Sequence, residues 1–300
     1  MSGDAPKNFI QIYQYGFGRK SSPKTWPKYI AKIGHKWYPV ESITEHLLNR
    51  LGDVFNIRTA YSQLRMVHGQ LRFLSRYFLK ANQILTHGAE IYSAYLEEDG
   101  AEFIDQIEEA KLSRSWITFQ FTIQAIQHTF AQKSGPIVAD FVKMLVFDAI
   151  VGNNDRHFYN WGVIEDVHHL HDPLFSPVYD TARGLFWNED EAALERKYLE
   201  LGNFKLTAIH KYAEKSMPKL GWEGEYEVTH FQLISNICGL GPHYHEICKS
   251  VILSVELTNV ESFLHTEFEH LISPLRLALI KVCLDYRVNR LKEIFLATQI

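Results

Sequence analysis

The sequence has few cysteines and no long hydrophobic run, and both absences narrow the classes of protein to which it can belong. Its three cysteines, Cys238, Cys248 and Cys283, are few and odd in number, which argues against a disulfide framework. No apolar segment reaches the roughly 20 residues needed to span a bilayer, and the N-terminus has no basic-then-apolar signal pattern. We therefore expect a cytoplasmic protein without a membrane segment.

The sequence also lacks a large excess of either charge. Its 31 basic and 35 acidic residues give a net charge of −4, so no overall field favours nucleic acid or an anionic membrane, and only local basic patches remain open. We expect no direct nucleic-acid binding. Internal repeats, low-complexity tracts and long Pro/Gly/Ser linkers are missing as well. The 300 residues are thus expected to form tightly joined parts.

The residues that are present indicate an α+β protein of two unequal parts. Between residues 8 and 80, short strand-like runs (9–15, 29–33 and 70–73) alternate with one amphipathic helix at 43–51. From about residue 84 most patterns are helical, apart from one strand pair between Trp161 and Tyr179. We predict a small β-rich N-terminal lobe, residues 1–80, and a larger, mainly helical lobe, residues 81–300.

One polar segment follows the most hydrophobic helix. Residues 136–151 are apolar nearly all round, which predicts a buried helix, and Gly152 is suited to end it. Residues 153–160 then form a polar loop. Beyond this loop, a predicted hairpin leads to Asp180. The hairpin therefore connects the loop that contains Asp155 to a second loop that contains Asp180.

The spacing of these polar residues is typical of phosphoryl transfer. An alcohol that attacks the γ-phosphate of ATP must lose its proton to a carboxylate, and Mg²⁺ on the phosphates needs hard oxygen ligands. In protein kinases, a Mg²⁺-binding Asn lies five positions after the catalytic Asp, and a second Asp follows a strand pair. Asp155, Asn160 and Asp180 have this arrangement.

The order of residues in the loop, GNNDRHFYNWG at 152–162, resembles the HipA-like serine/threonine kinase family, whose best-known members are bacterial toxins. The resemblance implies a bilobal protein-kinase-like fold that uses ATP and Mg²⁺ to phosphorylate a protein substrate. It also implies that Asp155 is the catalytic base, that Asn160 and Asp180 bind Mg²⁺, and that His157 orders the loop through hydrogen bonds.

The same resemblance implies where the first lobe binds the nucleotide. It suggests a phosphate loop at residues 16–24, a strand lysine that clamps the α- and β-phosphates, and a hinge at residues 75–77 whose backbone holds adenine. The corresponding nucleotide-binding residues are Gly16, Gly18, Lys32, Ser75 and Tyr77.

Two glutamates compete for the helix position that pairs with Lys32 in the family. Glu41 fits the family's spacing to a glycine that closes the helix, here Gly52. Glu45 completes the pattern Ser42-Ile-Thr-Glu45, which reads as a capping box and gives it a structural role at the helix start. We favour Glu41.

The sequence departs from the family pattern in three respects. The proposed phosphate loop lacks the usual Gly-Ala-Gln core, and Asp180 is followed by Thr-Ala-Arg rather than Phe-Gly. The sequence begins almost at that loop, so it resembles the short family members, including secreted or split-toxin versions. The resemblance therefore does not by itself imply an antitoxin-type partner, and this question stays open. It also stays open whether the protein is exported as an effector without a recognisable signal peptide.

Two serines in the proposed phosphate loop suggest self-regulation. HipA-like kinases are known for inhibitory autophosphorylation of a loop serine, and Ser21 and Ser22 are the candidates. Phosphate there would repel ATP.

Simpler explanations exist for several of these features. Residues 153–157 also suit a turn after a helix, and two glycines around an aromatic suit a plain hairpin. A second His/Cys cluster could hold zinc, but its spacing is unlike the usual paired patterns, and a helix–turn–helix with a buried cysteine is favoured; its residues are Cys238, His243, His245 and Cys248.

The sequence therefore predicts an ATP-dependent protein serine/threonine kinase. Three alternatives stay open: a kinase of lipids or small molecules on the same core, a catalytically inactive nucleotide-binding interaction module, and a helical domain with a structural polar loop.

Overall fold

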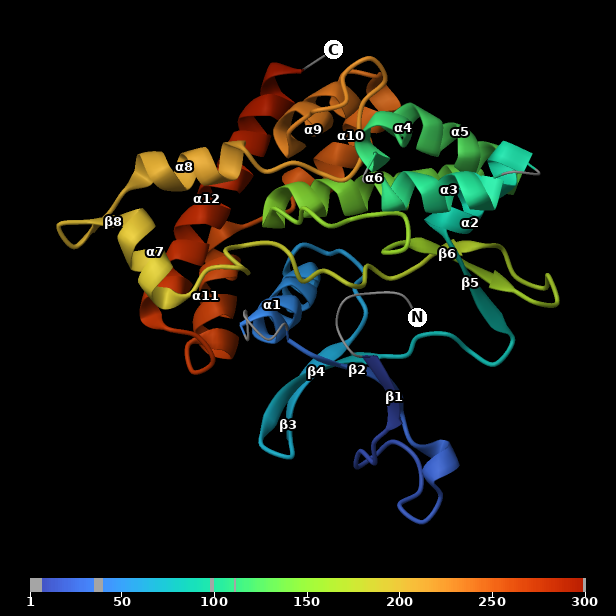
Figure 1. Cartoon of the computed structure of the whole chain (residues 1–300), viewed down its shortest axis with the longest axis horizontal. Helices are drawn as coiled ribbons and strands as arrows, with labels where there is room; N and C mark the ends of the chain where they lie inside the picture. The colour runs from blue at the N-terminus through green and yellow to red at the C-terminus, as the bar shows by residue number, and fades with distance from the viewer. Residues whose placement is uncertain (1–6, 35–39, 98–99, 111, 299–300) are drawn as a thin grey trace.

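The computed structural model describes residues 7–34, 40–97, 100–110 and 112–298. Its secondary structure divides the chain into a small antiparallel sheet near the N-terminus and a larger helical body, which confirms the predicted α+β, two-lobed fold class (Figure 1). The described residues contain no helix long and apolar enough to cross a bilayer.

The first sheet has four strands in the order β1-β2-β4-β3, all antiparallel to their neighbours. Its strands are β1 (Lys7–Gln11), β2 (Lys28–Ile33), β3 (Ser62–Val67) and β4 (Gln70–Arg76). Lys7 pairs with Lys32 across β1 and β2, and Gln11 pairs with Lys28. The connection between these strands, which includes the short 3-10 helix η1 (Pro23–Thr25), consequently lies at the end of the hairpin away from Lys32.

Helix α1 (Glu41–Val54) links this sheet to the helical body. It begins two residues before the predicted start, at Glu41, and Val40 is the N-cap residue, so Ser42 does not act as the cap. Its leucines Leu47, Leu48 and Leu51 belong to the large hydrophobic core, whereas the sheet has only a small core cluster of its own around Tyr29, Ala31 and Leu74. The first lobe thus depends on the second for much of its packing.

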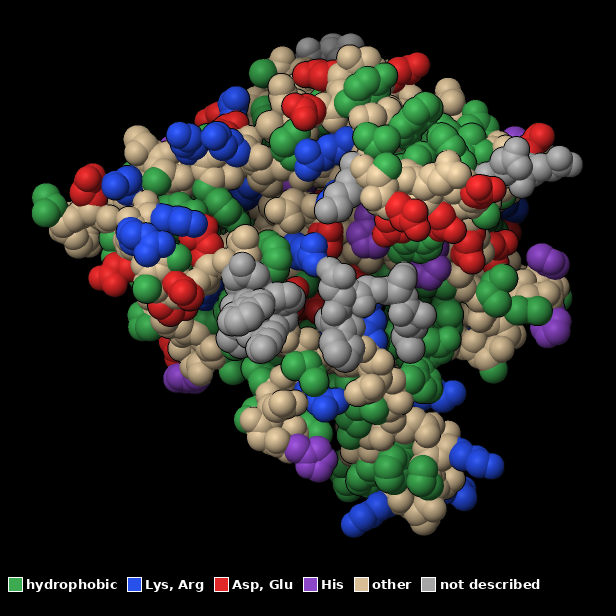
Figure 2. Space-filling view, in the orientation of Figure 1, with side chains coloured by type: hydrophobic (Ala, Val, Ile, Leu, Met, Phe, Trp, Pro, Cys, Tyr) green, Lys and Arg blue, Asp and Glu red, His purple; other side chains and the backbone are tan. Residues whose placement is uncertain are grey.

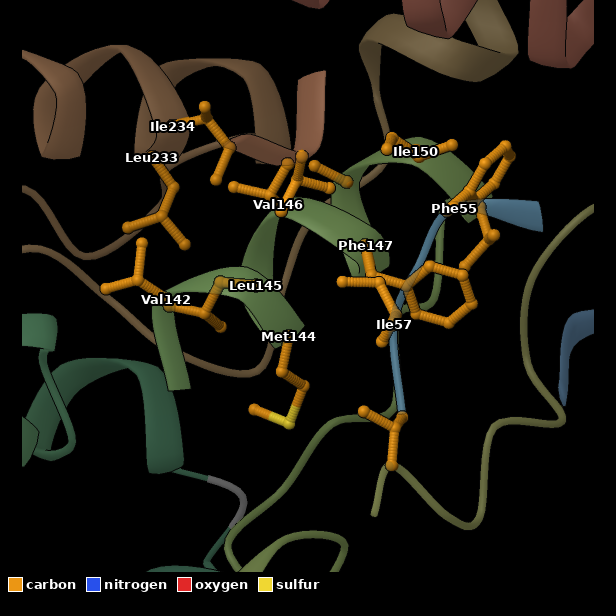
Figure 3. Packing of buried hydrophobic residues seen from close by; sticks show 14 of the residues in the cluster. Phe55, Ile57, Val142, Met144, Leu145, Val146, Phe147, Ile150, Leu233 and Ile234 are labelled. Carbon is orange, nitrogen blue, oxygen red and sulfur yellow. The ribbon is translucent and has the colours of Figure 1, made fainter. Parts of the chain in front are cut away.

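The helical body surrounds helix α6 (Ser134–Val151), as predicted. Twelve of its 18 residues are buried, and side chains from other elements pack around it (Figure 3). Burying one large aliphatic or aromatic side chain contributes about 1.5–3 kcal/mol, so this helix is a principal source of stability. It ends at Gly152, whose φ of 68° places it in the left-handed region that glycine adopts without strain.

Residues 77–82 connect the first sheet to a second one, with the strands β5 (Gln83–His87), β6 (Gly162–Asp166) and β7 (Leu174–Phe175). Strands β6 and β7 are the predicted hairpin, and β5 extends it on one side. The two strands β8 (Leu199–Glu200) and β9 (Asn203–Phe204) form a third, short sheet.

The remaining helices complete the helical body, and several of them pack directly against α6 (Figure 1). The helices before α6 are α2 (Gly88–Leu96), α3 (Gly100–Glu109), α4 (Ser113–Trp116), α5 (Phe119–Phe130) and the 3-10 helix η3 (Ala131–Lys133). Those after it are α7 (Glu191–Tyr198), α8 (Leu206–Glu214), α9 (His230–Cys238), α10 (Pro242–Ile252), α11 (Leu257–Phe268) and α12 (Pro274–Ala297).

Candidate active site

A cleft of about 1430 Å³ lies where the first sheet meets the helical body. Its walls come from β2, α1 and the connection after β4 on one side, and from the loop after α6 and the segment after β7 on the other. The cleft brings together most of the predicted site residues, far apart in the sequence: Lys32, Glu41, Ser75, Tyr77, Asp155, His157, Asn160 and Asp180.

Four charged side chains form the centre of the cleft. Lys32 on β2 places its Nζ 2.7 Å from Glu45 Oε1 and 2.6 Å from Asp180 Oδ1. Lys7, at the start of β1, lies 3.0 Å from the other carboxylate oxygen of Asp180. Two cations from the first sheet thus hold one carboxylate of the helical body between them.

The charges of this group depend on each other. Burial disfavours the charge of Lys32, but the carboxylates of Glu45 and Asp180 raise its pKa above the usual range. Burial also disfavours the charge of Asp180, and Lys32 with Lys7 nevertheless holds its pKa well below the usual range. Burial raises the pKa of Glu45 to about 7, Asp180 adds to this effect, and Lys32 opposes it.

The structure corrects our choice of partner for Lys32. Glu45, not Glu41, makes the contact, because α1 starts at Glu41 and carries Glu45 on the buried side of its second turn. The capping-box interpretation of Glu45 was wrong for the same reason: its side chain faces Lys32 from inside the helix. Glu41 lies one turn earlier at the edge of the cleft.

The loop after α6 presents Asp155 and Asn160 to the cleft. Asn160 donates its side-chain N–H to the Asp155 carbonyl at 2.9 Å, which directs its amide oxygen away from that carbonyl. The Asp155 carboxylate Oδ2 lies 3.3 Å from Nε of Arg183. The loop is therefore tied internally and to the segment after Asp180.

His157 is mostly buried, and its hydrogen bonds lie within the loop. Its Nδ1 lies 3.3 Å from the Tyr159 N–H, and its backbone N–H donates to the Asp155 carbonyl at 2.9 Å. Burial lowers the pKa of His157, with Asp155 opposing the shift. His157 also lines the cleft.

Arg156 provides the main support of the loop, and the sequence analysis did not identify it. Its guanidinium donates to both carboxylate oxygens of Asp148 on α6, at 2.8 and 3.0 Å. It also donates to the carbonyls of Asn160 and Tyr179, at 2.7 and 2.6 Å. A single buried arginine thus fixes the loop of Asp155 to the strand end that carries Asp180.

The structure does not place the predicted phosphate loop at the cleft. Gly16 and Gly18 are exposed, do not line the cleft and lie in the β1–β2 connection, at the far end of the hairpin from Lys32. Both have positive φ, 84° and 86°, and a Cβ at Gly18 would lie 2.4 Å from the Thr25 carbonyl oxygen. The glycines are required by the turns of a hairpin connection, which was the simpler of the two explanations.

Lys7, rather than a residue of this loop, lines the cleft next to Asp180. Residues 1–6, directly before Lys7, lie outside the described residues.

The predicted hinge lines the cleft, although its backbone is partly occupied. Ser75 pairs with Ile30 in the sheet, and the Tyr77 N–H donates to the Lys28 carbonyl at 2.9 Å. Phe78 and Leu79 follow, and both line the cleft. Their backbone N–H groups make no hydrogen bond within the part of the chain that the structure describes.

The alternative zinc site is not formed. Cys238 and Cys248 are buried next to each other in α9 and α10, but His243 is exposed and His245 stacks on Phe295. No group of three or more potential ligands among His, Cys, Asp and Glu is gathered anywhere in the described ranges. The favoured helix–turn–helix with a buried cysteine agrees with these positions.

Comparison with known proteins identifies the family and the fold of the chain. Residues 1–256 match the family described as the HipA-like C-terminal domain. In addition, 85 residues are 34% identical to the protein named "Putative kinase Y4dM" of Sinorhizobium fredii. That match covers 26% of this chain and only 20% of Y4dM.

Two solved structures have a similar fold. The Helicobacter pylori proinflammatory kinase CtkA superimposes with a TM-score of 0.76 over 100% of this chain and 94% of CtkA, at 14% identity. HipA of Shewanella oneidensis, solved in complex with HipB and operator DNA, gives a TM-score of 0.58 at 13% identity. The alignment covers 98% of this chain and 66% of HipA.

Proposed function

The chain belongs to the family of HipA-like C-terminal domains, and on this basis we propose that it is an ATP-dependent protein serine/threonine kinase. The observation that carries the proposal is the convergence of Lys32, Asp155, Asn160 and Asp180 on one cleft. These are the residue types that a phosphoryl-transfer site needs.

In the proposed reaction, the oxygen of a serine or threonine hydroxyl attacks the γ-phosphorus of ATP. The bond from that phosphorus to the bridging oxygen of ADP breaks, and the hydroxyl proton passes to the carboxylate of Asp155. Lys32 and Lys7 would bind phosphate oxygens, and Glu45 would keep Lys32 in position.

The donor set at the helical side of the cleft fits Mg²⁺. Asp180 offers a carboxylate, and Asn160 offers an amide oxygen, both of which are hard ligands that Mg²⁺ prefers. Both oxygens of Asp180 contact lysines in the structure. Mg²⁺ would neutralise phosphate charge, and the two lysines would then have phosphates as alternative anionic partners.

Adenine would bind at the connection between the two lobes. Phe78 and Leu79 combine apolar side chains with backbone N–H groups that make no hydrogen bond within the described residues. We therefore propose that adenine contacts these two residues, directly after the predicted Ser75–Tyr77 hinge.

The size of the cleft supports a second substrate next to the nucleotide. Its volume of about 1430 Å³ exceeds the roughly 300–1,000 Å³ typical of small-molecule sites. Besides the proposed nucleotide-binding residues, the cleft is lined by Glu108, Ser113, Lys219 and Tyr226. A protein segment is the acceptor we propose, and a lipid or small-molecule alcohol is the alternative.

Self-phosphorylation of Ser21 or Ser22 would occur between two molecules. Ser21 is exposed, and both serines lie in the β1–β2 connection at the far end of the hairpin from Lys32. The rate of labelling should therefore rise with the square of protein concentration. A first-order rate, or phosphate found only at other serines, would exclude this idea.

The proposal also leaves room for an antitoxin-type partner. The similar HipA structure contains HipB and operator DNA, but this chain covers 66% of that HipA, so no such partner is assigned. Co-purification from the native cell, followed by identification of bound proteins, would decide this.

The test of the proposed function is transfer of label from γ-labelled Mg-ATP to proteins of a cell extract, followed by phosphoamino-acid analysis. We expect phosphoserine or phosphothreonine with the wild type and none with Asp180→Asn. Label found only in lipids or small molecules would favour the alternative acceptor. ATP binding without any transfer would favour the inactive module.

A further inference from the structure

The three residues after Asp180 differ from the usual kinase sequence, and the structure shows where they lie. Where Phe-Gly is common, the chain has Thr181-Ala-Arg183. Arg183 lines the cleft, and its Nε lies 3.3 Å from Oδ2 of Asp155, the proposed base. The arginine is thus an ion-pair partner of the base within the same cleft.

The backbone around Arg183 is held firmly. Its carbonyl accepts the Asn154 N–H at 3.1 Å, so Arg183 is bonded to the residue before the base. Gly184 follows, and a Cβ there would lie 2.6 Å from the Val151 carbonyl oxygen, which leaves no room for a side chain. This close packing against the end of α6 fixes where the arginine side chain starts.

The side chain lies between an aromatic ring and the base. The guanidinium carbon of Arg183 is 5.2 Å from the centroid of the Trp187 ring, a distance typical of a cation–π contact. A third of the Arg183 side chain remains exposed, so ligands in the cleft can reach it.

We propose that Arg183 is a positioning residue for Asp155 and supplies the positive charge that stabilises the transferring phosphoryl group. This inference rests on the proposed kinase function. The ion pair occupies Oδ2 of Asp155 and leaves Oδ1 to receive the hydroxyl proton. Since base and phosphorus flank the same hydroxyl oxygen, a cation beside the base lies close to the charge that develops during transfer.

The test is steady-state phosphate transfer by the wild type, Arg183→Ala, Arg183→Lys and a matched control, Arg196→Ala. Arg196 is an exposed arginine on α7, away from the residues that line the cleft. For Arg183→Ala we expect kcat to fall by about 100-fold or more, with KM for ATP changed less than about threefold. Arg196→Ala should match the wild type.

Chemical rescue distinguishes the proposed role of the Arg183 guanidinium from a purely structural role in the fold. Added guanidinium ion should restore part of the kcat of Arg183→Ala and should not raise that of the wild type or Arg196→Ala. If Arg183→Ala does not fold, Arg183→Lys decides, since it keeps the charge without the planar fork: we expect kcat to fall about tenfold or more.

The inference would be overturned if kcat of Arg183→Ala stays within about threefold of the wild type, or if only KM for ATP changes in this variant. If only Arg183→Lys folds, a kcat of Arg183→Lys equal to that of the wild type would overturn it. Each of these leaves the proposed function intact, because the wild type transfers phosphate in all of them. A wild type that transfers no phosphate contradicts the proposed function itself.

Discussion

The two parts into which we predicted the sequence to divide, at residue 80, carry opposite charge. Residues 1–80 contain 13 Lys and Arg against 4 Asp and Glu, a balance of +9, whereas residues 81–300 contain 18 against 31, a balance of −13. Figure 2 shows Lys and Arg side chains around the protruding end formed by β1–β4. The net charge of −4 is thus the sum of two strongly charged halves.

This difference explains how the cleft is assembled. The first lobe supplies the cations Lys7 and Lys32, and the helical body supplies the carboxylates of Asp155 and Asp180. ATP needs cations for its phosphates, and its acceptor and metal need carboxylates. The division has an exception on each side: Glu45 is an acidic group of the first lobe that holds Lys32, and Arg183 is a cation of the helical body that lies beside Asp155.

The largest expected effect is the loss of the base from the acidic lobe. Asp155→Asn preserves the shape of the side chain but removes its ability to take a proton, so kcat for transfer should fall by about 10²–10⁴-fold. Binding of Mg-ATP should stay within a few-fold of the wild type. Transfer at more than about a third of the wild-type rate would place the base elsewhere.

The next effect concerns the support that joins the two acidic segments. Arg156→Met leaves the carboxylate of Asp148 buried without its partner, which typically costs about 3–5 kcal/mol. Urea unfolding should show this loss. The matched control is Arg290→Met, whose ion pair with Glu293 is exposed and should cost less than about 1 kcal/mol. Equal losses in the two variants would contradict the assigned role of Arg156.

Acid should destabilise the helical lobe through a buried histidine. His230 lies between Ser216 Oγ, at 2.8 Å, and the Asn153 carbonyl, at 2.9 Å. Burial lowers its pKa from 6.5 to about 3, with Arg287 adding to the shift. A base whose pKa is lower in the folded state stabilises the fold above pH 6.5 and loses that contribution as pH falls toward 3.

The measurement is the free energy of unfolding at pH 7.5 and pH 5. Wild type should lose about 2 kcal/mol more than His230→Gln over this range, since the glutamine does not titrate. A loss of equal size in both proteins would assign the acid sensitivity to other groups.

The smallest expected effect distinguishes the role of Glu45 from that of Glu41, the other glutamate of α1. Glu45→Gln removes the charge that holds Lys32, and kcat/KM for ATP should fall about tenfold. Glu41→Gln is the matched change one helical turn earlier and should have less than about a twofold effect. A larger effect of Glu41→Gln than of Glu45→Gln would identify Glu41 as the functional partner of Lys32.

The sequence predicted the parts of the fold that depend on local signals. The apolar residues of α6, the glycine that ends it and the hairpin that follows are patterns within about 45 residues, and all were located correctly. Strands β3 and β5 were missed, because neither has clear alternation of apolar and polar residues; β5 also depends on pairing with the distant strand β6, whereas β3 pairs with its neighbour β4.

The site was harder to predict wherever a contact spans the chain. Lys7 and Asp180 are 173 positions apart, and only the three-dimensional fold shows that they meet. The role of Glu45 depended on where α1 begins, a boundary that shifted by two residues. Arg156 was read as part of a motif, although its five hydrogen bonds show that it is structural support.

The most direct test of this account is a calorimetric titration of ATP, with and without Mg²⁺, into wild type, Lys32→Met and Asp180→Asn. If cations of the first lobe bind phosphates and carboxylates of the second bind the metal, Mg²⁺ should strengthen binding to the wild type. That gain should disappear in Asp180→Asn, and Lys32→Met should bind ATP more weakly under both conditions. A wild type that binds no ATP, or equal binding by all three proteins, would contradict the account.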